Sequence, residues 1–334
     1  MPRILLSTTS FQDTPGRHHQ VLAESGFEVI RARGPLHEAQ LLDLLADGRG
    51  FDGLLNGDDY ITARVIDAAL PRLKVIAKYG IGLDSIDVAH ATARHLPVLF
   101  TPGVNETTVA EHTIGLMIAV AKGFWFHLRA VKAGRWDRQT GCELCGKTLG
   151  VIGLGRISRE VVKRMSGFGM TCIGWGNYWD EDFARQYHLQ RMARWEDLLA
   201  AADVVSLHTN ATPATRGMIN AKTLALMKNG AILINTARGS LVVEEDVAAA
   251  CRSEKLRGYG ADVMAIEPLQ HPHIFELLDN VIVTPHIGSR TNESVQRQGL
   301  RAVNNLVNFL TGKYGCQCHL YRHCICSTCN PKIE

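Results

Sequence analysis

Short apolar segments alternate with longer amphipathic segments along most of the chain. In the first third, the apolar segments are nearly continuous, and stretches long enough to form helices follow them. Continuous apolar runs of this length are typical of parallel strands that helices cover on both faces. The predicted strands lie at residues 4–7, 27–31, 51–55, 73–77 and 98–100, with predicted helices at 18–25, 36–45 and 62–69.

A second strand–helix series follows a long predicted helix at 107–121 and a polar connector at 132–146. Its predicted strands lie at 148–152, 171–175, 204–207, 231–235, 259–263 and 281–284, and an amphipathic helix is predicted at 291–310. The two series predict an α/β fold with two Rossmann-like, doubly wound parallel-sheet domains and a cleft between them, where ligands are commonly bound.

The composition excludes several classes of protein. Of the 334 residues, 46% are hydrophobic and 21% are charged, and the formal net charge is only +3, which gives no electrostatic reason to expect a nucleic-acid or membrane partner. The amino terminus becomes polar too early for a signal peptide, and no apolar run approaches the roughly 20 residues of a membrane span. Four cysteines are scattered over the first 315 residues, as in a reducing compartment. We therefore expect a cytoplasmic protein.

The segment from Thr148 to Ser158 is a strand that runs into a glycine-rich turn and then a helix. Gly153 permits the tight turn, and Gly155 lets a pyrophosphate approach the backbone, where the first amides of the helix face the anion. A further strand begins about 20 residues later, as a dinucleotide-binding unit requires. The alternative is a purely structural glycine turn.

The second strand of this unit ends without the acidic residue that usually binds the ribose 2′-hydroxyl. Gly176 stands where an aspartate or glutamate is expected, so nothing there repels a 2′-phosphate, and Arg156 could reach one. The third glycine of the motif is replaced by Ser158, which is small enough for close packing of the helix. The sequence therefore predicts NAD as cofactor and leaves NADP open.

Three polar residues follow predicted strands of the second series. Arg238, Glu267 and His286 each lie just beyond a strand, and ligands of parallel α/β sheets bind beyond the carboxyl ends of strands. An arginine suits a carboxylate, and a histidine beside a carboxylate suits proton transfer. Taken singly, each has a simpler explanation: a surface ion pair, a solvated loop residue and a histidine in a turn.

Together these residues and several ordered motifs resemble the D-isomer-specific 2-hydroxyacid dehydrogenases of the phosphoglycerate dehydrogenase type. The resemblance covers about residues 73–310, and its motifs lie at 78–87, 101–105, 108–112, 148–158, 235–239, 262–268 and 285–288. It implies a discontinuous catalytic, substrate-binding domain at 1–103 plus 290–334, and an NAD(P)-binding domain at 104–289. It also implies a homodimer.

The resemblance implies a role for each matching residue. Arg238 would bind the substrate carboxylate, His286 would be the general acid and base, and Glu267 would hydrogen-bond His286 and raise its pKa. The implied substrate-binding residues are Lys78, Tyr79, Gly80, Ile81, Gly82 and Arg238. The implied cofactor-binding residues are Thr108, Gly153, Gly155, Arg156, Ile157, Gly176, Thr209, Thr236, Ala237, Asp262 and Gly288, of which Asp262 would receive the nicotinamide carboxamide.

The loop after the third strand bears on which hydroxy acid is used. Phosphoglycerate dehydrogenases bring an arginine to the substrate phosphate from this loop, and Gly57 stands at the matching position. Asp58 and Asp59 would repel a phosphate, so we expect an unphosphorylated acid similar to hydroxypyruvate or glyoxylate. The alternatives are that the two aspartates cap the helix near Thr62, and that Lys78 supplies a positive charge.

Proteins that resemble this chain also have other functions, which are the alternatives to the predicted one. The runner-up is phosphoglycerate dehydrogenase itself, although a chain of this length is expected to lack the C-terminal regulatory domain of some such enzymes. Dinucleotide-sensing corepressors with this fold retain the arginine, glutamate and histidine and form a rival class. Formate dehydrogenases of the superfamily have glutamine in place of Glu267, which disfavours formate as substrate.

Five cysteines crowd the end of the chain. The spacings Cys-x-Cys and Cys-x-x-Cys can chelate zinc, and four thiolates would satisfy its tetrahedral preference. The tail does not resemble the family's usual ending, so we expect no metal, and the candidates are Cys316, Cys318, Cys324, Cys326 and Cys329.

Overall fold

The structure is a computed structural model that describes residues 1–313. The chain divides into two compact units, which the following paragraphs treat one at a time. Unit 1 comprises Met1–Asn105 together with the described residues from Arg290 onward, and unit 2 comprises Glu106–Ser289. The five terminal cysteines that we considered as metal ligands lie outside the described residues.

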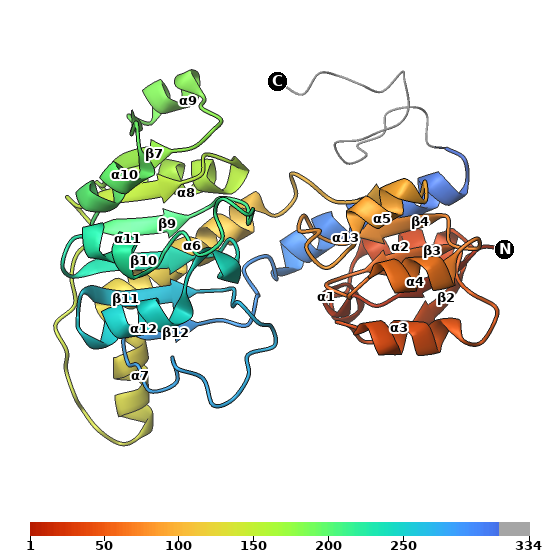
Figure 1. The fold of residues 1–334 in the computed structure, drawn as a ribbon, viewed down its shortest axis with the longest axis horizontal. Coiled ribbons are helices and arrows are strands. Elements are labelled where there is room, and N and C mark those ends of the chain that lie inside the picture. Colours follow the sequence, from red (N-terminus) through yellow and green to blue (C-terminus); the bar gives the residue numbers. More distant parts are fainter. Residues whose placement is uncertain (314–334) are drawn as a thin grey trace. The chain divides into compact units, whose positions relative to one another are not determined.

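Unit 1 is built on a five-stranded parallel sheet in the order β2-β1-β3-β4-β5, of which β2, β3 and β4 are labelled in Figure 1. Every residue of β1, β3, β4 and β5 is buried, which explains why these strands are apolar except for Arg3, Asn56 and Lys78 at their ends. The strands are β1 (Arg3–Leu6), β2 (Glu28–Arg31), β3 (Gly53–Asn56), β4 (Val75–Lys78) and β5 (Val98–Leu99). The order reverses between β1 and β3, so the carboxyl ends of these strands are the expected place for a ligand.

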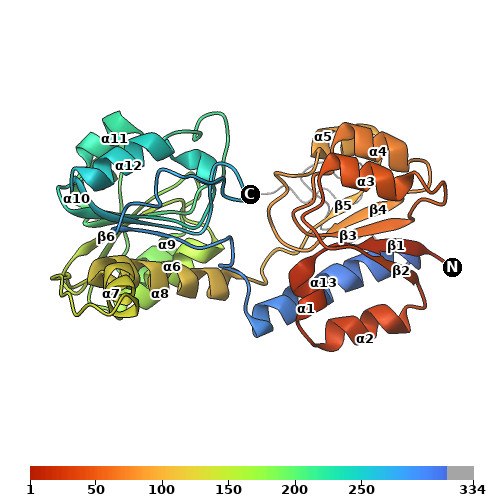
Figure 2. The same cartoon turned by 90° about the horizontal axis from the view of Figure 1, so that it is seen from below.

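Helices cover both faces of this sheet (Figure 2). One face carries α3 (Glu38–Leu45), α4 (Ala63–Ala69) and α5 (Val88–Ala93). The other carries α1 (Thr9–Asp13), α2 (Arg17–Glu24) and α13 (Asn292–Leu310). The chain therefore returns to unit 1 at its end, where Val303 and Leu306 of α13 pack into the core beneath the sheet.

Unit 2 is built on a seven-stranded parallel sheet in the order β12-β11-β10-β9-β6-β7-β8. Its strands are β6 (Thr148–Ile152), β7 (Thr171–Trp175), β8 (Gln190–Arg191), β9 (Val204–Leu207), β10 (Ala231–Asn235), β11 (Leu256–Ala261) and β12 (Val281–Val283). The chain leaves β6 in one direction towards β8 and returns to add β9 on the other side of β6. This reversal creates a switch point at the carboxyl ends of β6 and β9.

Two helical layers enclose the sheet of unit 2 (Figure 2). One contains α10 (Trp195–Ala201), α11 (Ala221–Leu226) and α12 (Glu244–Arg252), and the other contains α6 (Glu106–Lys122), α7 (Phe124–Lys132), α8 (Arg156–Ser166) and α9 (Glu181–Gln186). A short 3-10 helix, η1 (Gly239–Leu241), follows β10. No single helix of residues 1–313 is long and apolar enough to cross a membrane; α6 and α7 meet that criterion only jointly, with a 68° bend between them.

The prediction of two parallel-sheet α/β domains is confirmed, and most predicted strands agree with observed ones to within one or two residues. The strand expected at 259–263 is wrong in its bounds, because β11 is Leu256–Ala261. Glycine disfavours strands, but here Gly258 and Gly260 permit close packing: a Cβ atom at Gly258 would lie 2.4 Å from the Asn280 carbonyl oxygen. The hydrophobic pattern predicted neither α1, α5, α7 and β8 nor the bounds of α9, α10, α11 and α12.

Candidate active site

The glycine-rich turn after β6 has the geometry that a dinucleotide phosphate requires. Gly153 has a φ of 98°, and a Cβ atom there would lie 2.7 Å from the His208 carbonyl oxygen, so only glycine fits. Gly155 is the N-cap of α8 and supplies no side-chain hydrogen bond to its first amides, and a Cβ atom on it would meet nothing within 4 Å. The space beside Gly155 at the start of α8 is therefore open, which fits a pyrophosphate group bound at the amino end of the helix.

The residues expected around a dinucleotide follow neighbouring strands of unit 2. Arg156 and Ile157 begin α8, Gly176 follows β7, and Thr209 follows β9 by two residues. A Cβ atom at Gly176 would lie 3.0 Å from the Leu154 amide nitrogen, so this position is tight as well as uncharged. The structure thus gathers these residues along the switch point of the sheet.

Hydrogen bonds from its own side chains fix the backbone of the segment after β10. The Asn235 side chain donates a hydrogen bond to the Arg238 carbonyl oxygen at 2.9 Å, and its own oxygen accepts from the Ala237 amide at 3.1 Å. The hydroxyl of Thr236 lies 2.8 Å from that of Thr113 on α6. Thr108 is buried on the same helix. Arg238, whose guanidinium bonds the Ala237 carbonyl oxygen, is thereby fixed at the carboxyl end of β10.

Glu267 and His286 form a direct pair, although 19 residues separate them. The Glu267 Oε2 atom lies 2.7 Å from His286 Nδ1, and the second carboxylate oxygen accepts a hydrogen bond from the Met264 amide at 2.9 Å. Glu244 of α12 holds the same loop by accepting from the Ala265 amide at 2.8 Å. The carboxylate is therefore oriented from both sides, and it fixes which imidazole nitrogen faces it.

The strands that carry Arg238, Glu267 and His286 are neighbours in the sheet. β10 pairs with β11 and β11 pairs with β12, all in parallel, so the segments after them leave from one edge. A carboxylate-binding arginine and a carboxylate–histidine pair on one edge can bind an anionic substrate and exchange a proton with it. The three side chains that we selected from the sequence thus lie on adjacent strand ends.

Asp262 follows β11 and is almost fully buried, with 3% of its surface exposed. Its Oδ1 atom accepts from the Thr284 hydroxyl at 2.6 Å and the Ile287 amide at 2.9 Å, and its Oδ2 atom accepts from the Gly288 amide at 2.7 Å. Burial raises the pKa of Asp262, but the hydrogen bonds from His112, Thr284 and Ile287 outweigh it, and the pKa lies below the usual 3.8. Asp262 is therefore an ionised, fully oriented carboxylate.

In unit 1, the residues expected to bind substrate follow β4, beside the carboxyl end of β3. The Tyr79 ring packs towards Phe11 with centroids 6.5 Å apart, and burial raises the pKa of Tyr79 to about 12. The Gly80 amide donates to the Thr101 hydroxyl at 3.0 Å. The Tyr79 side chain and the Gly80 amide are thus engaged within the unit.

The loop after β3 differs from expectation. Asp59 does not face a substrate, because it is 1% exposed and accepts hydrogen bonds from the Ser7 hydroxyl and, at 2.6 Å, from the Leu36 amide. Asp58 is exposed and pairs at 2.7 Å with the buried ammonium of Lys78, which also bonds the Gly57 carbonyl oxygen. Neither aspartate caps α4, whose N-cap is Thr62. The interpretation that the two aspartates cap the helix is therefore wrong, and the interpretation that both would repel a substrate phosphate is wrong for Asp59.

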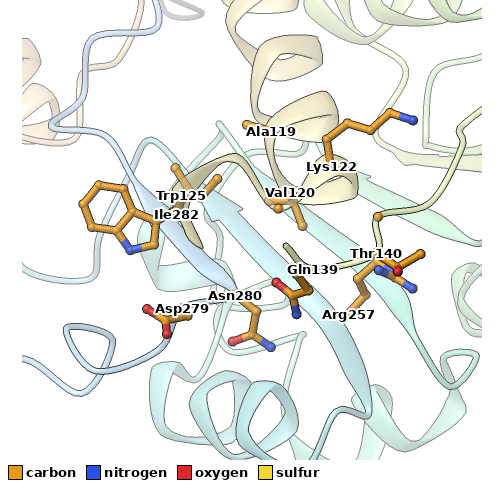
Figure 3. Close-up of a pocket in the computed structure, with 12 residues that line it drawn as sticks. Ala119, Val120, Lys122, Trp125, Gln139, Thr140, Arg257, Asp279, Asn280 and Ile282 are labelled. Carbon is orange, nitrogen blue, oxygen red and sulfur yellow. The ribbon is translucent and has the colours of Figure 1, made fainter. Parts of the chain in front are cut away.

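A small cavity in unit 2 lies away from these strand ends (Figure 3). It holds about 30 Å³ and is lined by Val120, Gln139, Arg257 and Asn280 among others, near the amino ends of β11 and β12. That volume suits one or two water molecules, and the cavity is at the opposite edge of the sheet from Arg238 and His286. It is not a substrate site.

Sequence reasoning assigned no role to His112, Thr113 or Thr284. His112 of α6 contacts the Thr284 hydroxyl at 2.9 Å, and Thr113 contacts Thr236. The signal available was the ordered motif at 108–112, which ends at His112 and is followed directly by Thr113 on the long helix.

Comparisons with known proteins agree on the family and the fold. Residues 114–288 match the family model described as D-isomer specific 2-hydroxyacid dehydrogenase, NAD binding domain. The chain is 38% identical over 296 residues to a D-3-phosphoglycerate dehydrogenase of Methanocaldococcus jannaschii, covering 88% of this chain and 55% of that protein. It is 38% identical over 284 residues to a glyoxylate reductase of Thermofilum pendens, covering 81% of this chain and 82% of that protein.

A crystal structure of a Thermus thermophilus protein superposes with a TM-score of 0.83 at 38% identity, covering 93% of this chain and 97% of that one. The chain spans about half the length of the curated D-3-phosphoglycerate dehydrogenases that it matches.

Proposed function

This chain belongs to the D-isomer specific 2-hydroxyacid dehydrogenase family, and we propose that it is an NAD(P)-dependent oxidoreductase that interconverts a D-2-hydroxy acid and a 2-keto acid. The observation that carries the proposal is the pair formed by Glu267 and His286, whose Oε2 and Nδ1 atoms lie 2.7 Å apart. The two residues follow β11 and β12, and Arg238 follows β10, which pairs with β11. A nicotinamide bound in unit 2 supplies or accepts the hydride.

The side chains of this chain do the remaining work. His286 donates a proton to the carbonyl oxygen when a keto acid is reduced, and accepts the hydroxyl proton in the reverse direction. Glu267 accepts the hydrogen bond of Nδ1, which assigns the exchanged proton to Nε2. Arg238 pairs with the substrate carboxylate. We propose that residues 1–103 plus 290–334 form the substrate-binding domain and that residues 104–289 bind the cofactor.

The cofactor is NAD, and we propose that NADP is also accepted. The support is Gly176, which has no carboxylate to bind the 2′-hydroxyl or repel a 2′-phosphate. Arg156, exposed on the first turn of α8, is the cation that would meet the phosphate.

The substrate that we propose is unphosphorylated, similar to glyoxylate or hydroxypyruvate. Asp59 does not support this substrate class, because its side chain is buried. The proposal of an unphosphorylated substrate therefore rests on Gly57 and Lys78. Gly57 offers a phosphate no side chain, and the Lys78 ammonium is already paired with Asp58 at 2.7 Å. A phosphate dianion would have to break that pair or bind beside its carboxylate, at a cost of about 1 kcal/mol per pair of unit charges at 4 Å in water.

The test is steady-state turnover of the purified full chain, followed at the absorbance of the reduced nicotinamide. NADH and NADPH are each tried with glyoxylate, hydroxypyruvate, pyruvate, phenylpyruvate and 3-phosphohydroxypyruvate, and His286→Ala is the control. We expect turnover of an unphosphorylated acid that the control loses. A preference for the phosphorylated acid identifies a phosphoglycerate dehydrogenase, and cofactor-dependent peptide binding without any turnover identifies a corepressor-like protein.

A substitution at Gly57 tests the substrate class separately. We expect Gly57→Arg to improve kcat/KM for 3-phosphohydroxypyruvate by about tenfold, which is the effect of about 1.4 kcal/mol of added attraction. A Cβ atom at Gly57 lies 3.3 Å from Thr8 Cβ, so a side chain fits after a small shift. Gly57→Met is the matched uncharged control, and an equal gain in both variants would contradict the charge argument.

We further infer a homodimer in the cytoplasm. Apolar side chains remain exposed on one short stretch of unit 2, which is the usual mark of a protein interface: Phe124, Trp125, Leu128 and Val131 of α7, and Trp136 after it. The four cysteines among the described residues are free thiols, as in a reducing compartment. Leu128→Glu should convert the dimer into monomers in light scattering, whereas a mass unchanged from wild type would refute this interface.

A further inference from the structure

A chain of hydrogen bonds connects α6 to the turn that carries His286. The His112 Nε2 atom lies 2.9 Å from the Thr284 hydroxyl oxygen and 3.3 Å from Asp262 Oδ1, and the Thr284 hydroxyl lies 2.6 Å from the same carboxylate oxygen. A hydroxyl has a single hydrogen, which Thr284 donates to Asp262, so its lone pair accepts from His112. His112 therefore carries its proton on Nε2, from which it donates to the Thr284 hydroxyl at 2.9 Å and, at a longer 3.3 Å, to Asp262 Oδ1, while Thr284 donates to Asp262.

Asp262 in turn holds the backbone on the far side of His286. Its two oxygens accept the amides of Ile287, at 2.9 Å, and of Gly288, at 2.7 Å, which are the next two amides along the chain. On the near side, the His286 amide donates to the Thr284 carbonyl oxygen at 2.9 Å. The turn is therefore clamped both before and after the histidine.

The clamp acts on a strained residue. His286 has a φ of 52°, in the left-handed region that costs a residue with a side chain about 1–2 kcal/mol. Such a conformation persists only where surrounding contacts over-determine it. If Asp262 were free to rotate, the Ile287 and Gly288 amides would lose their acceptors and the turn could relax, moving the His286 imidazole.

We propose that His112 and Thr284 are positioning residues, which orient the Asp262 carboxylate so that it clamps the backbone of the His286 turn. Neither residue needs to touch substrate, because both act through Asp262. The inference rests on the proposed function, in which His286 exchanges the proton. It gives Asp262 a role in addition to the carboxamide contact expected for it.

Two conservative pairs of variants test the clamp. Thr284→Val removes the hydroxyl while keeping the shape, and Thr284→Ser restores it. His112→Leu removes the donor, and His112→Gln places an amide nitrogen near the original Nε2 position. Thr92→Val on α5 is the matched control, because its hydroxyl donates to the Val88 carbonyl oxygen in unit 1, away from Asp262.

The first readout needs no turnover. Hydrogen exchange of the peptide spanning 284–288 should show faster exchange at Ile287 and Gly288 in Thr284→Val and His112→Leu, by about tenfold or more for a loss of at least 1.4 kcal/mol of local protection. Thr284→Ser, His112→Gln and Thr92→Val should exchange as wild type does. Unchanged exchange in Thr284→Val would overturn the clamp, whatever the activity shows.

The second readout separates kcat from cofactor binding. A displacement of the imidazole by about 1 Å is worth up to about 100-fold in rate, so kcat should fall about 10- to 100-fold in Thr284→Val and His112→Leu and recover in the serine and glutamine variants. The double variant should lose little more than either single variant, since the two residues act through one carboxylate. A kcat retained at saturating NADH, with only a higher Kd for NADH, would overturn the positioning role.

The catalytic role proposed for His286 and the clamp proposed for its turn are refuted by different results. Retained turnover in His286→Ala would refute the catalytic assignment and the effect on kcat that depends on it, while the exchange measurement still decides the clamp. Loss of turnover in His286→Ala with wild-type kcat in all four variants at His112 and Thr284 would leave the proposed function standing and overturn this inference.

Discussion

The position most sensitive to a single methyl group is Gly239, which follows Arg238. A Cβ atom at Gly239 would lie 1.9 Å from the Met264 carbonyl carbon, 2.1 Å from its oxygen and 2.4 Å from the Ala265 nitrogen. All three are backbone atoms, so no side chain can rotate away. Ordinary contacts begin near 3.4 Å, so Gly239→Ala must separate the segments after β10 and β11 by about 1.5 Å.

That separation acts on both halves of the proposed site. One segment carries Arg238, and the other holds Glu267 through the Met264 amide at 2.9 Å. A misplacement of about 1 Å can cost 100-fold in rate, so we expect kcat/KM of Gly239→Ala to fall at least about 100-fold. Overpacking of a buried contact typically costs about 1–3 kcal/mol, so the free energy of unfolding should fall by that amount.

The assay combines keto-acid reduction with urea unfolding, and Gly115→Ala is the matched control. Gly115 lies within α6, where a Cβ atom would meet nothing within 4 Å, so the same substitution should stabilise the protein by about 0.5–1 kcal/mol and leave kcat within about twofold. If Gly239→Ala keeps kcat/KM within threefold and its unfolding free energy within about 0.5 kcal/mol of wild type, the reasoning from backbone contact is refuted.

Three further outcomes are expected. Burial lowers the pKa of His208 from 6.5 to about 4, so the unfolded chain binds a proton that the native state excludes, and stability falls as the pH falls. Relative to His208→Gln, wild type should lose up to about 3 kcal/mol of unfolding free energy between pH 7 and pH 4 in urea titrations, and a difference independent of pH would contradict this. Arg156→Gln should raise KM for NADPH about tenfold and leave KM for NADH within twofold, and equal effects on both cofactors would exclude a 2′-phosphate contact. Burial raises the pKa of Asp59, so its ionisation opposes folding; the stability of Asp59→Asn relative to wild type should rise as the pH rises from below 3.8 through that raised pKa, and a constant difference would refute the buried charge.

The local pattern of apolar residues and glycines determined most of the strands and the dinucleotide turn of this protein. Strands such as β3 and β10 are fully buried and apolar except for the asparagine that ends each, and the spacing of Gly153 and Gly155 between a strand and a helix is typical of a dinucleotide-binding turn. These features depend on neighbours a few residues away, so they are visible in the sequence. The three polar residues at strand ends were also visible, since parallel strands deliver their carboxyl ends to one edge.

Side-chain pairing across the fold was decided only by tertiary structure. His112 and Thr284 are separated by 172 residues, and nothing in either segment indicates that the other will be beside it. Asp58 and Asp59 are adjacent and chemically identical, yet one is exposed beside Lys78 and the other is buried beneath Leu36.

The physical reason is the difference in range between the two kinds of information. Hydrophobic periodicity and turn chemistry fix φ, ψ and burial locally, and they specify a sheet without specifying which side chains of distant segments meet. Strand order and close packing fix those meetings: Gly258 and Gly260 lie in β11 because the Asn280 carbonyl oxygen and α6 leave no room for a side chain. The sequence by itself determined two parallel α/β sheets and the turn for a dinucleotide; the packed structure alone decided the pairing of His112 with Thr284 and the buried carboxylate that clamps the His286 turn.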